Sequence, residues 1–345
     1  MSKKLRVGVI GAGGIATSVH MPSLAEIENV EVVAICDLRE EKAKKLAEKY
    51  GVKKTYALYD EMFEKEEMDA IFVLVNPDCT FRVSRDCMLA GYHVMMEKPA
   101  GLDAYQAYSL ARISEKTGKV AGVAMNRRHI PLVQEVIKKL KEVTEITQVD
   151  GRFVKFGDIA STWDYGSAFN CDIVHAIDLI RYIAGAEPAD AATVKARFNS
   201  PVDNAWSSVM LFENGVIGTL RANYQSSSRV HDFEIHGPNA SAYIDLGFAT
   251  AHAKAKIIYG DGTVIYSAAS AGLGNNNIEE LDGKVIAGGE EYHQYYGYKS
   301  EDIDFINSIL EGRKPLCTID DAAKTMDMVE MLLDNCINET PKEQY

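Results

Sequence analysis

Short apolar runs alternate with amphipathic stretches over the first 125 residues of the chain. The apolar runs are rich in β-branched residues and predict strands at Leu5–Ile10, Glu31–Cys36, Thr55–Leu58, Ala70–Val75, Tyr92–Met96 and Val120–Met125. The stretches between them predict helices at Ile15–Glu28, Glu40–Tyr50, Asp60–Lys65, Thr80–Ala90 and Ala104–Thr117. Six strands that alternate with helices indicate an α/β domain with a doubly wound parallel sheet, which we assign to residues 1–125.

The pattern changes after Met125, where a polar run at Asn126–His129 precedes a predicted helix at Pro131–Lys141. The strands predicted beyond it are Val149–Phe156, Ala192–Phe198, Ser207–Phe212, Val216–Tyr224, Phe233–His236, Ala242–Leu246, Lys256–Tyr259 and Thr263–Tyr266. Further helices are predicted at Cys171–Ala184, Ser300–Glu311 and Asp320–Cys336. Consecutive strands with short turns form largely antiparallel sheets, so residues 126–345 are predicted to be an α+β domain that binds the substrate.

Composition narrows the class of protein. The chain has 345 residues, more than a single hydrophobic core usually supports, and its net charge of −13 argues against nucleic acid or an anionic membrane as the partner. Glycines at 8, 11, 13 and 14 interrupt the first apolar stretch. We therefore expect neither an export signal nor a membrane anchor, and a cytoplasmic protein. The six cysteines show no CxxC pair, which predicts reduced thiols.

A glycine-rich turn lies between the first predicted strand and the first predicted helix. Gly11–Ala16 has the pattern GxGxxA, in which the first glycine permits a tight turn and the second lets a pyrophosphate approach the backbone. Asp37 ends the second predicted strand, where an acidic side chain binds the adenosine ribose hydroxyls of a dinucleotide. Asp37 should repel a 2′-phosphate, which favours NAD, while the nearby Arg39 keeps NADP possible.

The triplet Glu97-Lys98-Pro99 directly follows the predicted strand Tyr92–Met96. Ligands bind at the carboxyl ends of the strands in such sheets, and Pro99 holds Lys98 extended. An ammonium group at this position serves either as a phosphate anchor or in proton transfer. Because the glycine-rich turn already supplies a phosphate site, we expect Lys98 to take part in proton transfer.

The predicted helix at Cys171–Ala184 carries Asp172, His175 and Asp178 at spacings that place them on one face. They could form a simple His–Asp hydrogen bond, a metal site together with Cys171, or a catalytic pair. We expect no metal, because the chain has no second ligand cluster and no familiar zinc spacing. Hydride transfer at a carbonyl needs a group that moves the hydroxyl proton, which favours the catalytic interpretation beside a nicotinamide site.

Taken together, these motifs resemble the Gfo/Idh/MocA family of glucose–fructose oxidoreductases and inositol dehydrogenases nearly end to end. The resemblance is carried by Gly8–Ala16, Gly91–Val94, Glu97-Lys98-Pro99, Asn126-Arg127-Arg128, His175–Arg181, Phe212–Gly215 and Glu234–Gly237. It implies a Rossmann domain followed by an open-faced, predominantly antiparallel sheet domain with helices on one face. That second domain commonly mediates oligomerisation in the family, so a homodimer or homotetramer through the sheet is expected.

The resemblance also implies a function: NAD(P)-dependent oxidation of a hydroxyl group of a sugar, polyol or related molecule, or the reverse reduction. The family's active site, a lysine of the triplet and an aspartate–histidine pair, carries over to Lys98, Asp172 and His175. Many members place the aspartate four residues before the histidine, where this chain has Cys171, whereas Asp172 lies three before. Whether Lys98 or His175 takes the proton therefore stays open.

Ligand contacts are expected along the same strand ends and on the second domain. The expected cofactor contacts are Gly11, Gly13, Gly14, Ile15, Ala16, Asp37, Arg39, Asn76, Pro77, Glu97 and Lys98. The expected substrate contacts are Lys98, Arg127, Trp163, Asp172 and His175. Trp163 offers an aromatic platform for a sugar or packs at an interface. Arg127 and its neighbour Arg128 either bind a substrate carboxylate or phosphate, or are solvated.

Two other functions stay open at this point. One is a redox-assisted glycosidase, which occurs among relatives and in which bound NAD is oxidised and reduced within each turnover. The other is a non-catalytic sensor of NAD or sugar. A sensor has no need for the lysine triplet together with the acid–histidine helix, so an enzyme is favoured.

Overall fold

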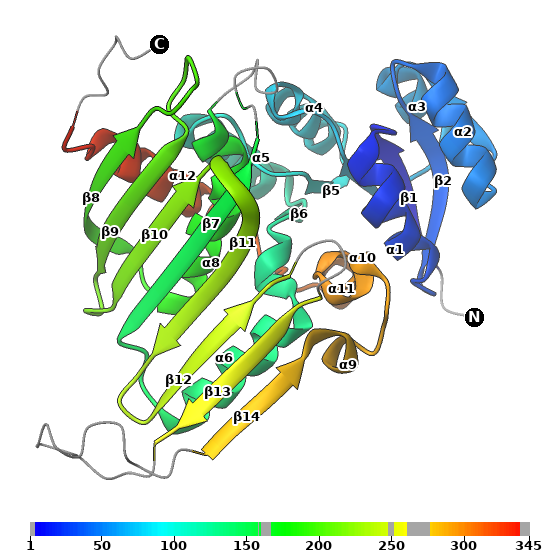
Figure 1. The fold of residues 1–345 in the computed structure, drawn as a ribbon. Helices are drawn as coiled ribbons and strands as arrows, with labels where there is room; N and C mark the ends of the chain where they lie inside the picture. The colour runs from blue at the N-terminus through cyan, green and yellow to red at the C-terminus, as the bar shows by residue number, and fades with distance from the viewer. Residues whose placement is uncertain (1–3, 158, 160–166, 248–251, 261–276, 339–345) are drawn as a thin grey trace, which may run out of the picture. The chain divides into compact units, whose positions relative to one another are not determined.

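The structure, a computed structural model, describes residues 4–157, 159, 167–247, 252–260 and 277–338 (Figure 1). By its contacts the chain divides into two compact units. The first unit comprises residues 1–126, 165–174 and 291–327, and the second comprises residues 127–164, 175–290 and 328–345. The division after residue 125 that the sequence predicts stays a prediction.

The first unit is built on a six-stranded parallel sheet with the order β3-β2-β1-β4-β5-β6. Its strands are β1 (Leu5–Ile10), β2 (Val30–Cys36), β3 (Lys54–Tyr56), β4 (Ala70–Val73), β5 (His93–Met96) and β6 (Ala121–Val123). All six were predicted from their apolar runs. The order places β1 and β4 side by side at the centre, where the direction of winding reverses and ligands bind in such sheets.

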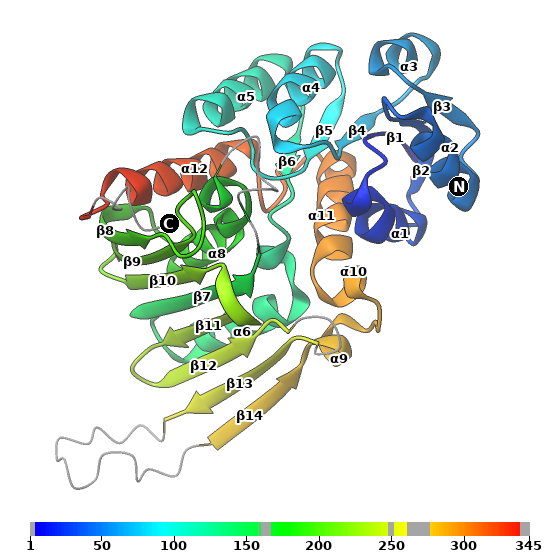
Figure 2. The same cartoon turned by 45° about the horizontal axis from the view of Figure 1, so that its top comes forward.

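Helices cover both faces of this sheet. They are α1 (Met21–Ala25), which continues a π-helical turn η1 (Ala16–His20), then α2 (Glu40–Tyr50), α3 (Tyr59–Lys65), α4 (Pro77–Leu89), α5 (Ala104–Thr117), α10 (Tyr292–Tyr295) and α11 (Tyr298–Glu311). Asp103 caps α5 by accepting a hydrogen bond from the backbone N–H of Gln106. Helix α11 lies beside α1, although some 280 residues separate them in the chain (Figure 2). Its Phe305 joins Val7, Val9 and Leu24 in one buried cluster.

The second unit contains an eight-stranded sheet with the order β14-β13-β12-β11-β7-β10-β9-β8. Its strands are β7 (Gln148–Phe156), β8 (Pro188–Ala196), β9 (Ala205–Phe212), β10 (Ile217–Asn223), β11 (Gln225–His236), β12 (Ala240–Asp245), β13 (Lys254–Tyr259) and β14 (Asn277–Asp282). Every neighbouring pair is antiparallel except β7 and β10, which run parallel. The predicted largely antiparallel sheet is thus confirmed. The sequence did not predict β14, and the predicted strand Thr263–Tyr266 lies outside the described residues.

Helices pack on one face of this second sheet. They include α6 (Pro131–Val143), α8 (Val174–Ala184) and α9 (Gly283–Ala287). A short 3-10 helix, η2 (Asn126–His129), precedes α6. Helix α12 (Ile319–Asp334) begins in the first unit and ends in the second. Helix α8 approaches β7 and β10 closely, because a Cβ atom at Gly151 or Gly218 would press against Ile180. The residues that alternate with these point away from the helices, so the opposite face is open. No helix within the described residues is long and apolar enough to cross a membrane.

Candidate functional site

The glycine-rich turn has the geometry that a dinucleotide requires. Gly11 follows β1 with φ of 102°, and a Cβ atom there would clash with the carbonyl oxygen of Leu74, so only glycine fits. In contrast, a Cβ atom at Gly13 or Gly14 would meet nothing within 4 Å. The chain's own packing therefore does not require these two glycines. Their missing side chains leave open space at the start of the helix, where a pyrophosphate fits.

Asp37 is held at the end of β2 by two backbone hydrogen bonds. Its Oδ2 accepts from the N–H of Ala12 at 2.8 Å, and its Oδ1 accepts from the N–H of Arg39 at 2.8 Å. Each carboxylate oxygen keeps a further lone pair for a ribose hydroxyl. The Arg39 side chain is 68% exposed, with its Nε 3.9 Å from Asp37 Oδ1.

The predicted cofactor residues follow one another along a single edge of the first sheet. Asp37 follows β2, Gly11 follows β1, Asn76-Pro77 follows β4 and Glu97-Lys98 follows β5. Three strand spacings, about 14 Å, separate the first position from the last, a span that suits an extended dinucleotide. The exposed Asn76 makes no side-chain capping bond to α4, so its amide stays available to a ligand. Among the flanking residues of the turn, Ala16 is buried and Ile15 packs against the core.

Lys98 lies against the segment that carries the predicted catalytic aspartate. Its Nζ donates to the carbonyl oxygen of Cys171 at 2.6 Å. Cys171 and Asp172 belong to a π-helical segment, η3 (Phe169–Ile173), which precedes α8 and takes the place of the predicted first turn of a single helix. His175 lies in α8 within the second unit. Trp163 lies outside the described residues.

Burial raises the pKa of the Cys171 thiol to about 11, although the nearby Lys98 charge acts in the opposite direction. Without a bound metal, Cys171 is therefore a thiol at neutral pH.

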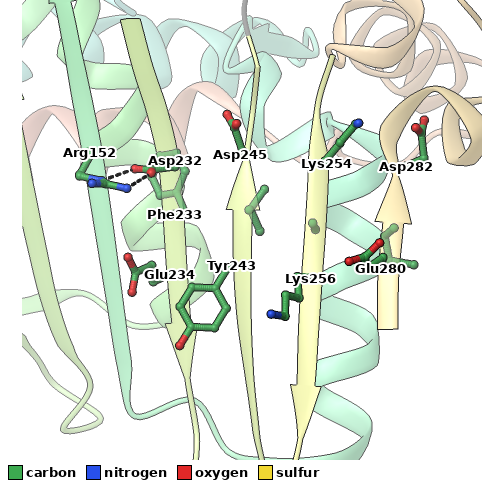
Figure 3. A pocket seen from close by; sticks show the side chains of 13 residues that line it. Arg152, Asp232, Phe233, Glu234, Tyr243, Asp245, Lys254, Lys256, Glu280 and Asp282 are labelled. Carbon is green, nitrogen blue, oxygen red and sulfur yellow. Dashed lines mark hydrogen bonds and ion pairs between the residues drawn. The ribbon is translucent and has the colours of Figure 1, made fainter. Parts of the chain in front are cut away.

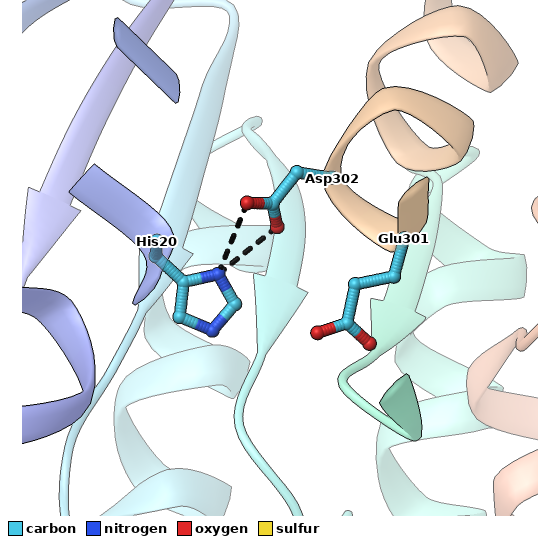
Figure 4. Close-up of side chains that lie close together, drawn as sticks. All are labelled: His20, Glu301 and Asp302. Carbon is cyan, nitrogen blue, oxygen red and sulfur yellow. Dashed lines mark hydrogen bonds and ion pairs between the residues drawn. The ribbon is translucent and has the colours of Figure 1, made fainter. Parts of the chain in front are cut away.

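A buried ionic cluster that the sequence did not predict supports the triplet. His20, in η1, lies between two carboxylates. Its Nδ1 is 3.0 Å from Asp302 Oδ1, a contact that Figure 4 shows. Its Nε2 is 3.2 Å from Glu97 Oε1. Burial lowers the pKa of His20, but the charges of Asp302 and Glu97 and the hydrogen bonds to them outweigh burial and raise it well above 6.5. Only the imidazolium donates at both ring nitrogens. His20 is therefore a buried cation that ties η1 to Glu97 and to α11.

No local pattern identifies this cluster in the sequence. His20 lies four residues after Ala16, but its partner Asp302 is 282 residues further along the chain. Glu301 lies beside them, and His20, Glu301 and Asp302 offer ligand atoms within 4.8 Å of one another, all of them buried. Because both nitrogens of His20 already face carboxylates, we interpret the cluster as an ion bridge.

The adjacent arginines after Asn126 are both buried, which excludes the alternative that their side chains are solvated. Arg128 Nε donates to Asp178 Oδ2 at 2.9 Å, and its Nη2 donates to Oδ1 of the same carboxylate. Asp178 therefore pairs with Arg128. Arg127 instead stacks on Phe153, with its guanidinium carbon 4.7 Å from the ring centroid.

A hollow of about 620 Å³ lies on the open face of the second sheet (Figure 3). Charged side chains of both signs line it, among them Arg152, Asp232, Glu234, Lys254 and Lys256. Arg152 forms an ion pair with Asp232 across β7 and β11. None of the predicted site residues that the structure describes lines this hollow.

Comparison with known proteins identifies the family. A family model described as an oxidoreductase family with an NAD-binding Rossmann fold matches residues 5–125, and a model of the GFO/IDH/MocA C-terminal domain matches residues 134–243. The chain belongs to the Gfo/Idh/MocA family. The predicted fold class and the prediction of an NAD-binding domain are thereby confirmed, and the protein is an NAD(P)-dependent oxidoreductase of this family.

Individual proteins show the range of the similarity. Myo-inositol 2-dehydrogenase of Thermotoga maritima is 28% identical over 251 residues, which cover 68% of this chain and 74% of that protein. D-glucoside 3-dehydrogenase of Escherichia coli is 33% identical over 127 residues, which cover 37% of this chain and 36% of the relative. An oxidoreductase from Agrobacterium radiobacter, solved with NAD+, L-tartaric acid and magnesium, has the same fold, with a TM-score of 0.80, 16% identity and 96% of both chains covered.

Proposed function

We propose that the protein transfers a hydride between NAD(P) and the carbon that bears a secondary hydroxyl or carbonyl group of a sugar, polyol or related small molecule. The observation that carries the proposal is the position of Lys98. Its ammonium nitrogen lies 2.6 Å from the carbonyl oxygen of Cys171, the residue before Asp172. Lys98 also lies at the same sheet edge as the glycine-rich turn and Asp37. The relatives named as acting on myo-inositol and on D-glucosides support the class of substrate.

Each residue then has one task. When bound, NAD(P) supplies the centre that exchanges the hydride. Lys98 hydrogen-bonds the reacting oxygen and shares or relays its proton, His175 accepts that proton in the oxidation direction, and Asp172 orients one of the two. The backbone-held carboxylate of Asp37 favours NAD, and the exposed Arg39 keeps NADP as the alternative cofactor. Arg127 contributes to binding the substrate.

Replacing the lysine tests these roles. We expect Lys98→Met to lower kcat by at least about 100-fold, because a proton-transfer group typically contributes 10²- to 10⁴-fold. NAD binding, measured by calorimetry, should change little, since the turn and Asp37 are untouched. The matched control is Lys116→Met, an exposed lysine in the last turn of α5, and it should behave like the wild type.

Turnover that is unchanged in Lys98→Met would contradict the assignment. The assay should follow NAD reduction with a panel of sugars, inositols and hydroxy acids. Cleavage of glycosides without net NAD reduction would instead indicate a redox-assisted glycosidase. NAD binding with no turnover of any panel member would indicate a sensor.

We further propose that a second copy of the chain covers the open face of the second sheet. Val194, Val209, Leu211 and Ile217 are each 45–55% exposed there, which is unusual for solvent-facing strand positions. The charged hollow carries lysines and acidic residues side by side. Its charges can therefore pair with the opposite charges of the same hollow in a twofold-related copy. Sedimentation analysis should show a homodimer or homotetramer for the wild type and a smaller species for Leu211→Glu.

We also propose the cytoplasmic location that the sequence predicts. The six cysteines, which form no disulfide bonds, support it.

A further inference from the structure

Arg127 is a buried cation whose hydrogen-bonding capacity is largely unused. Its side chain is 3% exposed, and its Nη2 lies 3.1 Å from Nδ1 of His231. Within the described residues, its Nε and Nη1 donate to no acceptor, although both atoms are buried. A guanidinium has five N–H groups and stays charged at all physiological pH values. Most of its N–H groups therefore lack a hydrogen-bond acceptor within the described residues.

The neighbouring residue shows what the chain does with a structural arginine. Arg128 is equally buried, and its charge is matched by a two-point contact with Asp178. Arg127 forms no ion pair with any carboxylate in the part of the chain that the structure describes. Leaving a buried charge unmatched destabilises a protein strongly. An anionic ligand would supply both the opposite charge and the hydrogen-bond acceptors for the Arg127 guanidinium.

Two further nitrogen-bearing side chains gather around the same aromatic ring. His231 pairs in register with Phe153 and stacks on its ring, with 4.1 Å between centroids. Lys155 lies two residues further along β7, on the same face of the sheet, with its Nζ 5.3 Å from the Phe153 centroid and 5.1 Å from that of Tyr224. Because Arg127 can only donate, Nδ1 of His231 is the acceptor, so a neutral His231 carries its proton on Nε2. All three side chains can donate to an anion.

We propose that Arg127, Lys155 and His231 form an anion-binding subsite, and that the natural substrate carries a carboxylate or phosphate in addition to its reacting hydroxyl. This inference rests on the proposed function and narrows it. The substrate class becomes acid sugars, hydroxy acids or sugar phosphates in place of neutral sugars. The guanidinium suits this task, because it binds carboxylates and phosphates through paired donors.

Matched substrates test the subsite with the full NAD-loaded protein. The panel compares D-glucose with D-glucuronate and with D-glucose 6-phosphate, so the last two identify carboxylate or phosphate as the preferred group. We expect kcat/KM for one anionic member to exceed that for D-glucose by about 10- to 100-fold, as for a hydrogen bond to a charged group. Arg127→Met and Lys155→Met should reduce this ratio toward one. Arg112→Met, at an exposed position of α5, should keep it. A neutral preference in the wild type, or an anionic preference that survives Arg127→Met, would overturn the proposal.

A binding measurement separates this inference from the proposed function. Inorganic phosphate and malonate are titrated against the NAD-loaded protein, in which the pyrophosphate site is already filled, and the melting temperature is recorded. We expect a saturable rise in the wild type for one of these anions and none in Arg127→Met. Equal rises in both proteins, or no rise in either, would contradict the subsite. Turnover of no panel member would refute the proposed function, while the titration would still decide on the subsite.

Discussion

His20 in the first unit and Arg127 in the second are both buried cations, but only His20 lies between carboxylates. Asp302 and Glu97 match its charge on both sides, and the three groups join η1, the segment that follows β5, and α11. Arg127 lies against Phe153 and His231 and forms no ion pair within the described residues. Matched buried charges hold elements together, whereas an unmatched one is unfavourable until a ligand arrives. The difference separates a cluster that supports the fold from one that is suited to binding.

Breaking the Arg128–Asp178 ion pair should give the largest loss of stability, because Arg128, like His20, is a buried cation with a carboxylate partner. Asp178→Ala leaves Arg128 buried without its carboxylate, which should lower the free energy of unfolding by about 3–5 kcal/mol. Urea denaturation followed by circular dichroism measures the change. Asp190→Ala, on the exposed edge of β8, is the control and should stay close to the wild type. A loss as small as that of the control would show that this pair does not support the fold.

The His20 cluster should give a smaller effect that depends on pH. His20→Asn removes the hydrogen bonds of a charged donor to Glu97 and Asp302, which should lower the free energy of unfolding by roughly 2–3 kcal/mol near pH 6. The pKa of His20 is raised in the folded protein, so its contribution is complete below the unfolded value of 6.5. It declines as the pH rises above 6.5 and is lost once the pH passes the folded pKa.

Urea titrations of wild type and His20→Asn from pH 6 to pH 10 measure this decline. The difference between the two proteins should shrink with rising pH. Glu301 and Tyr298 also face His20, and burial raises the pKa of Tyr298 well above 10. Both remain in the variant, so subtraction largely removes their titration. A difference that stays constant or grows with pH would contradict a protonated His20.

Sequence patterns predicted the elements of the first unit well, because its strands are buried on both faces and its helices have clear ends. Strand β1 and helices α2 and α5 have the predicted bounds. The strand-end residues Asp37 and Lys98 could be found in the same way, since both directly follow apolar runs. In these cases the signal lies within a few residues of the site.

The sequence could not reveal contacts between distant segments. Asp302 faces His20 only because α11 packs beside α1, and nothing near either residue encodes this pairing. The two adjacent arginines are equivalent as a pattern, and only the fold gives one of them a carboxylate partner. Strand β14 escaped prediction because its sequence, Asn277–Asp282, is largely polar and forms the edge of the sheet.

Replacing Arg127, which has no carboxylate partner within the described residues, should have the smallest effect on stability. Arg127→Met removes a buried charge without leaving a carboxylate unpaired, and methionine still packs on Phe153. We therefore expect the free energy of unfolding without ligand to change by less than about 1 kcal/mol, or to rise. Urea denaturation in buffer free of phosphate and carboxylates measures it. A loss as large as that in Asp178→Ala would show that Arg127 supports the fold, because a residue held for a ligand should be dispensable until the ligand binds.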